Sequence, residues 1–291
     1  MRVTASLLLL SLCLAAPLFA ATAAEHAAAG NTALDRRDAD KAAELFEKAV
    51  QLEPKNAKYH FLLGSAYGEM ARKANVFSQA SLARKTRAEF EKAVELDPNY
   101  IDARFALIQY YLIAPGFMGG GDDKAILQAA EIRKRDALDG HRAYTRIYSH
   151  QKKHDLARKE MVEAVREQPN SAKAHFYLGN VYMLEENWAA ALHEYEFAQK
   201  LDPNFMPVHF RIGQWTAKSG KELARGEASL RKYLGHKPAD NDPPHAATWY
   251  WLGQVQEKQG RKADAKTSYD NALKLAPGDK DVIAAKKRVS Y

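Results

Sequence analysis

Six pairs of side chains that could hold a ligand recur along the chain, and the two members of each pair are four residues apart. Residues at this spacing lie on one face of a helix. The pairs are Phe61 and Ser65, Phe105 and Gln109, Arg142 and Arg146, Phe176 and Asn180, Phe210 and Gln214, and Tyr250 and Gln254. Aromatic rings give contact area at low entropic cost and amides hydrogen-bond a peptide backbone, so the pattern favours an extended peptide. The alternative interpretation is that the rings pack against neighbouring helices.

Catalytic chemistry is not indicated by the remaining reactive side chains. The sequence has no Ser-His-Asp order and no Gly-x-Ser-x-Gly motif, and its single cysteine is Cys13. His150 and His154 are four apart, as metal ligands can be, but no glutamate lies between them and no third ligand is evident. Four further histidines share one recurring position, which predicts a packing role: His60, His141, His175 and His209. We therefore expect no enzyme activity, no metal and no cofactor.

A Gly-rich stretch at 115–121 could suggest a phosphate site. It lacks the Gly-Lys-Ser/Thr ending of a P-loop, and no strand pattern precedes it. Asp122 and Asp123 follow, and these carboxylates would repel phosphate and cap the next helix. We expect a lengthened turn between two helices, with Phe117 and Met118 exposed on its surface.

The elements that must position these residues are clearest in the stretch 171–203. Leu178-Gly179 is followed by Tyr182, and Pro203 ends the stretch. Between them lie three residues at helical spacing, Ala191, Tyr195 and Ala198. A glycine lets a second helix approach closely, the aromatic and alanine side chains fill the gap, and the proline ends the second helix. This pattern resembles the tetratricopeptide repeat, a helix-turn-helix unit of about 34 residues.

Related spacings continue through nearly the whole chain after the first 23 residues, with about ten extra residues inserted near 74–84. A helical period dominates throughout. The resemblance implies an all-α, right-handed superhelical solenoid of about seven helix pairs, closed by a C-terminal capping helix near 281–289. It also implies that the first helix of each pair lines a concave groove. The expected ligand residues are Phe61, Phe105, Gln109, Arg142, Arg146, Phe176, Asn180, Phe210, Gln214, Tyr250 and Gln254. The arginines would give this groove a positive centre.

The first 23 residues are typical of a secretory signal peptide. Arg2 precedes a short apolar stretch, and Ala21-Thr22-Ala23 fits a cleavage site, with Ala20 as a nearby alternative. We therefore expect a signal peptide at 1–23 and a repeat solenoid at 24–291. No later stretch is apolar enough to span a membrane. The formal net charge of +7 mildly favours anionic partners.

These observations favour a non-catalytic module of the bacterial cell envelope that binds a protein or peptide. The expected compartment is the periplasm, with secretion as the second choice, and export disfavours a nucleic-acid partner. The runner-up hypothesis is a binder of an anionic envelope polysaccharide, in which the rings would stack on sugars and the arginines would meet acidic groups.

Overall fold

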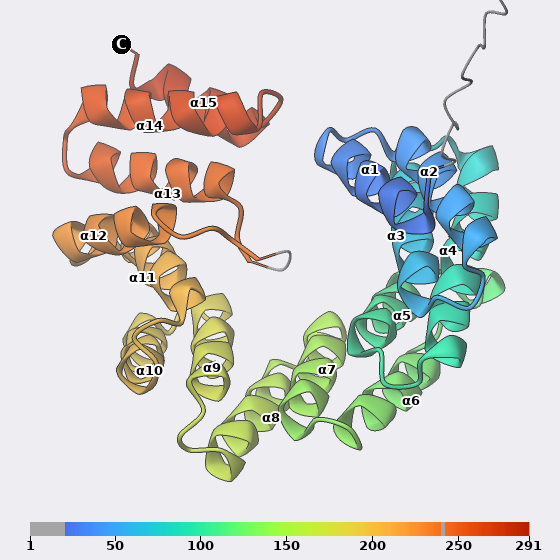
Figure 1. Ribbon diagram of the computed structural model, residues 1–291. Coiled ribbons are helices and arrows are strands. Elements are labelled where there is room, and N and C mark those ends of the chain that lie inside the picture. Colours follow the sequence, from blue (N-terminus) through green and yellow to red (C-terminus); the bar gives the residue numbers. More distant parts are fainter. Residues whose placement is uncertain (1–20, 240–241, 291) are drawn as a thin grey trace, which may run out of the picture. The chain divides into compact units, whose positions relative to one another are not determined.

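Fifteen α-helices make up the part of the chain that the computed structural model describes, residues 21–239 and 242–290, and no strand occurs there. They alternate in order along the chain (Figure 1). The first helices of the pairs are α1 (Ala23–Asp35), α3 (Ala57–Lys73), α5 (Ile101–Ile113), α7 (Ala137–His150), α9 (Ala172–Leu184), α11 (Met206–Ser219) and α13 (His245–Lys258). The second helices are α2 (Ala39–Leu52), α4 (Val76–Leu96), α6 (Asp122–Arg133), α8 (His154–Glu167), α10 (Trp188–Leu201), α12 (Leu223–Leu234) and α14 (Lys262–Leu275). A last helix, α15 (Lys280–Arg288), packs on α14.

The chain divides into two compact units, and the division falls between Leu107 and Ile108, inside α5. Within each unit, helices that follow one another along the chain pack together. The predicted all-helical stack of about seven pairs with a terminal helix is therefore confirmed. None of the described helices combines the length and the hydrophobicity that a membrane span needs. Residues 1–20, most of the predicted signal peptide, lie outside the described residues.

Each helix pair closes around the residues that the spacing predicted. At Gly179 a methyl group would lie 2.6 Å from the ring of Tyr195, and at Gly253 it would lie 2.4 Å from the ring of Tyr269. Glycine is therefore required at this position because a larger residue would push the second helix away. Ala191, Tyr195 and Ala198 are fully buried, as expected for residues that fill the gap between the helices.

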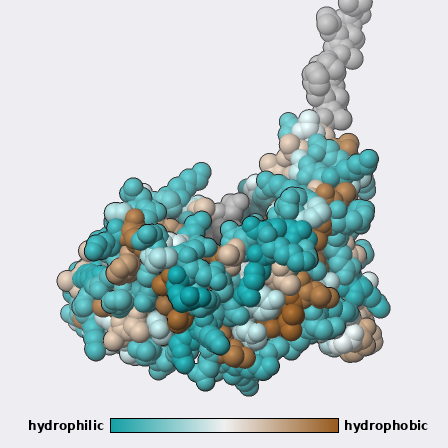
Figure 2. All heavy atoms as spheres, turned by 90° about the horizontal axis from the view of Figure 1, so that it is seen from below, coloured by the Kyte–Doolittle hydropathy of each residue, from teal (hydrophilic) through white to brown (hydrophobic). Residues whose placement is uncertain are grey.

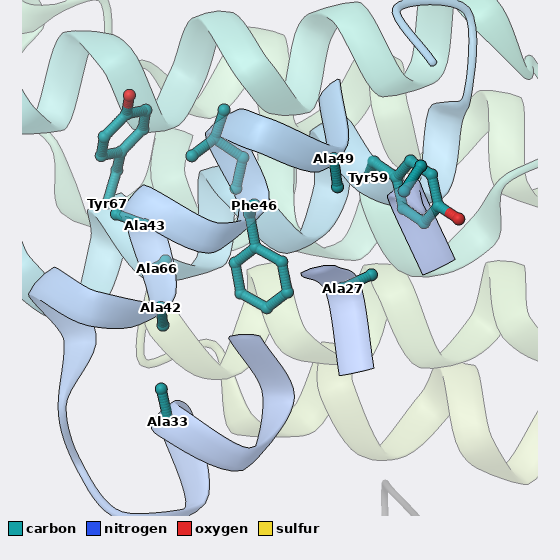
Figure 3. Packing of buried hydrophobic residues seen from close by; sticks show 11 residues of the cluster. Ala27, Ala33, Ala42, Ala43, Phe46, Ala49, Tyr59, Ala66 and Tyr67 are labelled. Carbon is teal, nitrogen blue, oxygen red and sulfur yellow. The ribbon is translucent and has the colours of Figure 1, made fainter. Parts of the chain in front are cut away.

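The first helix pairs show how small and large residues share the core. Phe46 of α2 lies among the alanines Ala27, Ala33 and Ala42, with the ring pointing between the helices (Figure 3). Phe46 and Ala42 are fully buried. Alternating large and small side chains in this way lets neighbouring helices interlock at close distance.

The turn within most pairs contains a residue in the left-handed conformation, seven positions after the glycine that contacts the second helix. Arg37 has φ 62°, Lys152 φ 59°, Glu186 φ 56°, and Gly220 and Gly260 φ 74° and 77°. The following residue donates its N–H to a carbonyl five positions earlier, as Asn187 does to Tyr182 at 2.9 Å. This hydrogen bond ends the first helix in a Schellman-type turn.

The insertion near 74–84 lengthens both helices of the second pair, as predicted. Helix α3 has 17 residues and α4 has 21, whereas the corresponding helices α9 and α10 have 13 and 14. Asn75 caps α4 by accepting hydrogen bonds from the N–H groups of Phe77 and Ser78, both at 3.1 Å. The added residues therefore form an ordered helical extension.

The Gly-rich stretch forms a lengthened, ordered turn, also as predicted. It contains a short 3-10 helix, η1 (Gly116–Met118), and Phe117 is 85% exposed. Met118 was expected to be exposed but is half-buried, because its carbonyl accepts a hydrogen bond from Tyr110 at 2.8 Å. The prediction of a side-chain cap for α6 was wrong: Asp122 and Asp123 lie within its first turn and make no capping hydrogen bond. Their charges still oppose the helix dipole favourably there.

Candidate ligand-binding face

The aromatic members of the six pairs pack mainly inside their own helix pairs. Phe176 is 7% exposed and lies 6.2 Å, centroid to centroid, from Tyr195, the ring that fills the gap to α10. Phe210 is 4% exposed and lies 5.7 Å from Tyr233 of α12. Both rings were expected to face a ligand, and that expectation is wrong for these two residues. The reason is that this position of the first helix meets the large side chain of the second.

The other aromatic members are half-buried, so part of each ring can still contact a ligand. Phe61 lies 5.8 Å from Phe90 and 5.1 Å from Tyr100. Tyr250 lies 6.1 Å from Tyr269 and 5.0 Å from Trp251. Phe105 is half-buried in α5. The interpretation that the rings pack against neighbours therefore accounts for most of their contacts.

The polar members lie at the edge of this packing and are half-buried or exposed. Asn180 accepts a hydrogen bond from the Tyr195 hydroxyl at 3.0 Å, and Gln254 donates one to the Tyr269 hydroxyl at 3.0 Å. Each amide thus keeps one polar group that is not used in these bonds. Gln109 is exposed on α5. These amides are positioned by the tyrosines beneath them.

The two arginines of α7 have different surroundings. Arg142 pairs with Asp139 one turn earlier, and its guanidinium lies 4.2 Å from the ring centroid of Tyr177 on α9. A cation over an aromatic face is held by the ring's negative face. Arg146 is exposed, and among the described residues no carboxylate pairs with it. Loss of surrounding water, and then the charge of Arg142, lower the pKa of Arg146.

Two residues next to the aromatic position were not among the predicted ligand residues. Tyr177 supports Arg142, and Trp251 packs edge-on against Tyr250. Arg211 occupies the same position on α11. It donates to Gln214 at 2.7 Å, and its Nε is buried without a hydrogen-bond partner among the described residues. Because these three residues directly follow Phe176, Tyr250 and Phe210, the register of the pairs could have found them.

The recurring histidines are buried, as predicted for a packing role. His60 and His175 each bring one ring nitrogen 2.6 Å from a glutamate of the second helix, Glu89 and Glu194 respectively. The other ring nitrogen of each lies 3.0 Å from the carbonyl of a proline that ends the previous helix. Each histidine therefore ties three successive segments together.

His141 departs from this arrangement because no proline precedes α7. It lies 2.7 Å from Glu160 and 3.3 Å from Glu167, and Arg133 approaches the same ring nitrogen as Glu160. A pocket of about 440 Å³ opens here between α7 and α8. No three His, Cys, Asp or Glu side chains gather as a metal site would need in the part of the chain that is described.

Models of the tetratricopeptide repeat match residues 27–70, 146–204 and 246–279. These stretches are tetratricopeptide repeats. A stretch of 116 residues is 28% identical to the cytochrome c-type biogenesis protein CycH of Pseudomonas aeruginosa. The alignment covers 40% of this chain and only 28% of that protein.

Solved structures with the same fold cover most of the repeats. A tetratricopeptide repeat protein from Parabacteroides merdae is similar with a TM-score of 0.53 at 14% identity, over 92% of this chain and 99% of that one. The human IFIT1 dimer with PPP-AAAA is similar with a TM-score of 0.57 at 17% identity, over 92% of this chain and 64% of that one. At these identities the likeness supports the fold alone.

Proposed function

We propose that this protein is a non-catalytic scaffold of the bacterial cell envelope whose first helices hold an extended segment of a partner protein. Tetratricopeptide repeats support a protein- or peptide-binding role. The observation that carries the anionic character of the ligand is Arg146, an exposed cation with no acidic partner among the described residues. We infer that an acidic side chain or a terminal carboxylate of the partner pairs with it.

The surroundings of Arg146 support an ordered site. Arg142 is fixed by Asp139 and by the ring of Tyr177, so the two guanidinium groups are presented from α7 with little freedom to lose on binding. Asn180 on α9 offers an amide next to this centre in the register of the pairs. A guanidinium and an amide together suit a carboxylate followed by peptide backbone.

The polysaccharide hypothesis is less well supported. Sugar stacking needs open aromatic faces, and Phe176 and Phe210 are buried. A peptide requires only the half-exposed edges and the polar groups. The partial likeness to a cytochrome c-type biogenesis protein supports a role in the assembly of another protein. The predicted signal peptide supports the envelope as the place of that assembly.

Photo-crosslinking in cells tests this proposal. A photoreactive residue is placed at Gln214 or at Tyr250, both half-exposed on first helices, and crosslinked proteins are identified by mass spectrometry. The matched control position is Lys266, which is exposed on the second helix α14. We expect one discrete protein enriched from the first-helix positions over the control.

Charge reversal then tests the role of Arg146. The variant Arg146→Glu should lower capture of the crosslinked partner about tenfold or more, since it replaces attraction by repulsion at the proposed contact. Lys266→Glu makes the same change of charge on α14 and should leave capture unchanged. Equal crosslinking from all three positions, or full capture by Arg146→Glu, would contradict the proposal.

A further inference from the structure

The extension of the α3–α4 pair carries an exposed aromatic ring that no core packing explains. Phe77, in the first turn of α4, is 92% exposed. Between 68 and 85 no side chain that the structure describes is buried, so this extension has no core of its own. A large apolar side chain held in water in this way indicates a contact surface.

The extension is also strongly basic. From 70 to 88 the chain contains five basic residues and no acidic residue: Arg72, Lys73, Arg84, Lys85 and Arg87. Arg72 pairs with Glu69 at its base, and Arg87 lies 3.6 Å from Glu91. Arg84 is exposed, and no acidic partner for it occurs among the described residues. The positive charge of the extension is therefore only partly neutralised.

Several hydrogen bonds hold the tip in place. Asn75 caps α4 directly before the exposed ring, and Gln79 donates to the carbonyl of Ala71 at 3.3 Å. Lys73 donates to the carbonyl of Arg37 at 2.8 Å, which joins the extension to the basic turn between α1 and α2. Arg36 and Arg37 in that turn are both exposed. The tip presents an aromatic ring with cations beside it in a fixed arrangement.

We propose that this extension, residues 70–88 with the Arg36–Arg37 turn, docks on the surface of an anionic phospholipid bilayer. Phe77 would enter the boundary between headgroups and acyl chains, where aromatic rings are favoured. The lysines and arginines would meet lipid phosphates, and each such cation adds attraction to an anionic surface. The exposed ring favours a bilayer over an acidic polypeptide, because such a polypeptide would use the cations and leave the ring in water.

The hydropathy of the rest of the surface agrees with a local contact. On the face drawn in Figure 2 hydrophilic residues predominate, and the hydrophobic ones form separate small groups. Phe117, the other strongly exposed aromatic residue named above, is followed by Asp122 and Asp123 and so lacks the cationic surroundings. Phe117 therefore serves as a matched control.

Sedimentation of the purified protein with vesicles tests the proposal. We expect binding to vesicles of phosphatidylcholine with 30% phosphatidylglycerol, falling steeply as salt is raised, and little binding to phosphatidylcholine alone. Phe77→Ser and the double variant Arg84→Glu/Lys85→Glu should each weaken binding about tenfold or more. Phe117→Ser should bind as the unchanged protein does. All these side chains are exposed, so circular dichroism should confirm an unchanged fold.

Two results would overturn the assignment. One is equal binding to both kinds of vesicle, or equal binding by the unchanged protein and the α3–α4 variants. The other is no vesicle binding together with binding of poly-glutamate that the charge-reversal variant loses, which would assign the extension to an acidic polypeptide. Neither outcome bears on the crosslinks from Gln214 and Tyr250, so the two proposals fail independently.

Discussion

His209 differs from the other three recurring histidines in its partner. His60, His141 and His175 each lie within 2.7 Å of a glutamate, whereas the Nδ1 of His209 lies 3.2 Å from the amide nitrogen of Gln199. Burial lowers the pKa of His209, the charge of Lys232 lowers it further, and the carbonyl of Pro203 acts in the opposite direction. The ring is therefore held in its neutral form.

This difference predicts an acid sensitivity. An unfolded chain protonates the histidine near pH 6.5, but the folded chain resists until a lower pH, so the unfolded state binds more protons between these two values. Stability should consequently fall as the pH drops below about 6.5. The variant His209→Phe should lose less stability than the unchanged protein between pH 7.5 and 5.5, measured by urea unfolding with tryptophan fluorescence.

The control for this prediction is His193→Gln, because His193 has a side chain that is 69% exposed. This variant should keep the pH dependence of the unchanged protein. If His209→Phe and His193→Gln respond to pH alike, His209 does not account for any of the acid sensitivity.

At the level of single residues, the sequence allowed the core to be predicted better than the ligand face. Gly179, Ala191, Tyr195 and Ala198 have the packing roles that their spacing indicated. Phe176 was misassigned because its side of α9 meets both α10 and the segment before α11, as its 5.1 Å contact with Phe205 shows. Spacing along one helix gives the face of a residue but not the distance to the next helix pair.

At the level of the helix pair, the left-handed turn residue is a source of strain. Glycine adopts this conformation freely, while other residues lose about 1–2 kcal/mol. Gly220 and Gly260 avoid that loss, but Lys152 and Glu186 do not. Both of these side chains are exposed, so replacing them disturbs no core contact.

We therefore expect Lys152→Gly and Glu186→Gly each to stabilise the protein by about 0.5–1 kcal/mol, after the greater freedom of glycine in the unfolded chain is subtracted. The two changes lie in different turns, so their effects should add. Thermal unfolding followed by circular dichroism measures them. Gly260→Ala should destabilise, and a destabilising effect of both glycine variants would contradict this account.

Helix boundaries and the insertion were predictable from spacing because prolines, glycines and cap residues mark them locally. The lengthening of α3 and α4 follows from counting residues between Gly64 and Phe90. The burial of part of the Gly-rich turn could not be predicted. It depends on Tyr110, whose hydroxyl reaches the carbonyl of Met118 from the preceding helix.

At the level of the whole molecule, the two compact units carry different spectroscopic probes. All four tryptophans, Trp188, Trp215, Trp249 and Trp251, lie after Ile108. Tryptophan fluorescence therefore reports on the second unit, while circular dichroism reports on both. Repeat proteins are held together by contacts between neighbouring repeats, so distant parts can unfold separately.

Substitutions in the two units should consequently act on different probes. A methyl group at Gly64 would lie 2.8 Å from the ring of Phe90, so Gly64→Ala should destabilise the first unit by about 1–3 kcal/mol. We expect it to shift the unfolding midpoint seen by circular dichroism and to leave that of fluorescence unchanged. Gly253→Ala should shift the fluorescence midpoint. Equal shifts of both probes by Gly64→Ala would mean that the units unfold together.

Helix α1 begins with a reciprocal pair of hydrogen bonds in which the hydroxyl of Thr22 accepts from the N–H of Glu25 at 3.2 Å, and the Glu25 carboxylate accepts from the N–H of Thr22 at 2.8 Å. The same two residues lie at the predicted processing site. If a peptidase cuts after Ala23, the mature chain loses Thr22 and begins with a charged amine at the positive end of the helix. A cut after Ala20 leaves the pair intact, so the choice of scissile bond decides whether the exported chain keeps an ordered first turn.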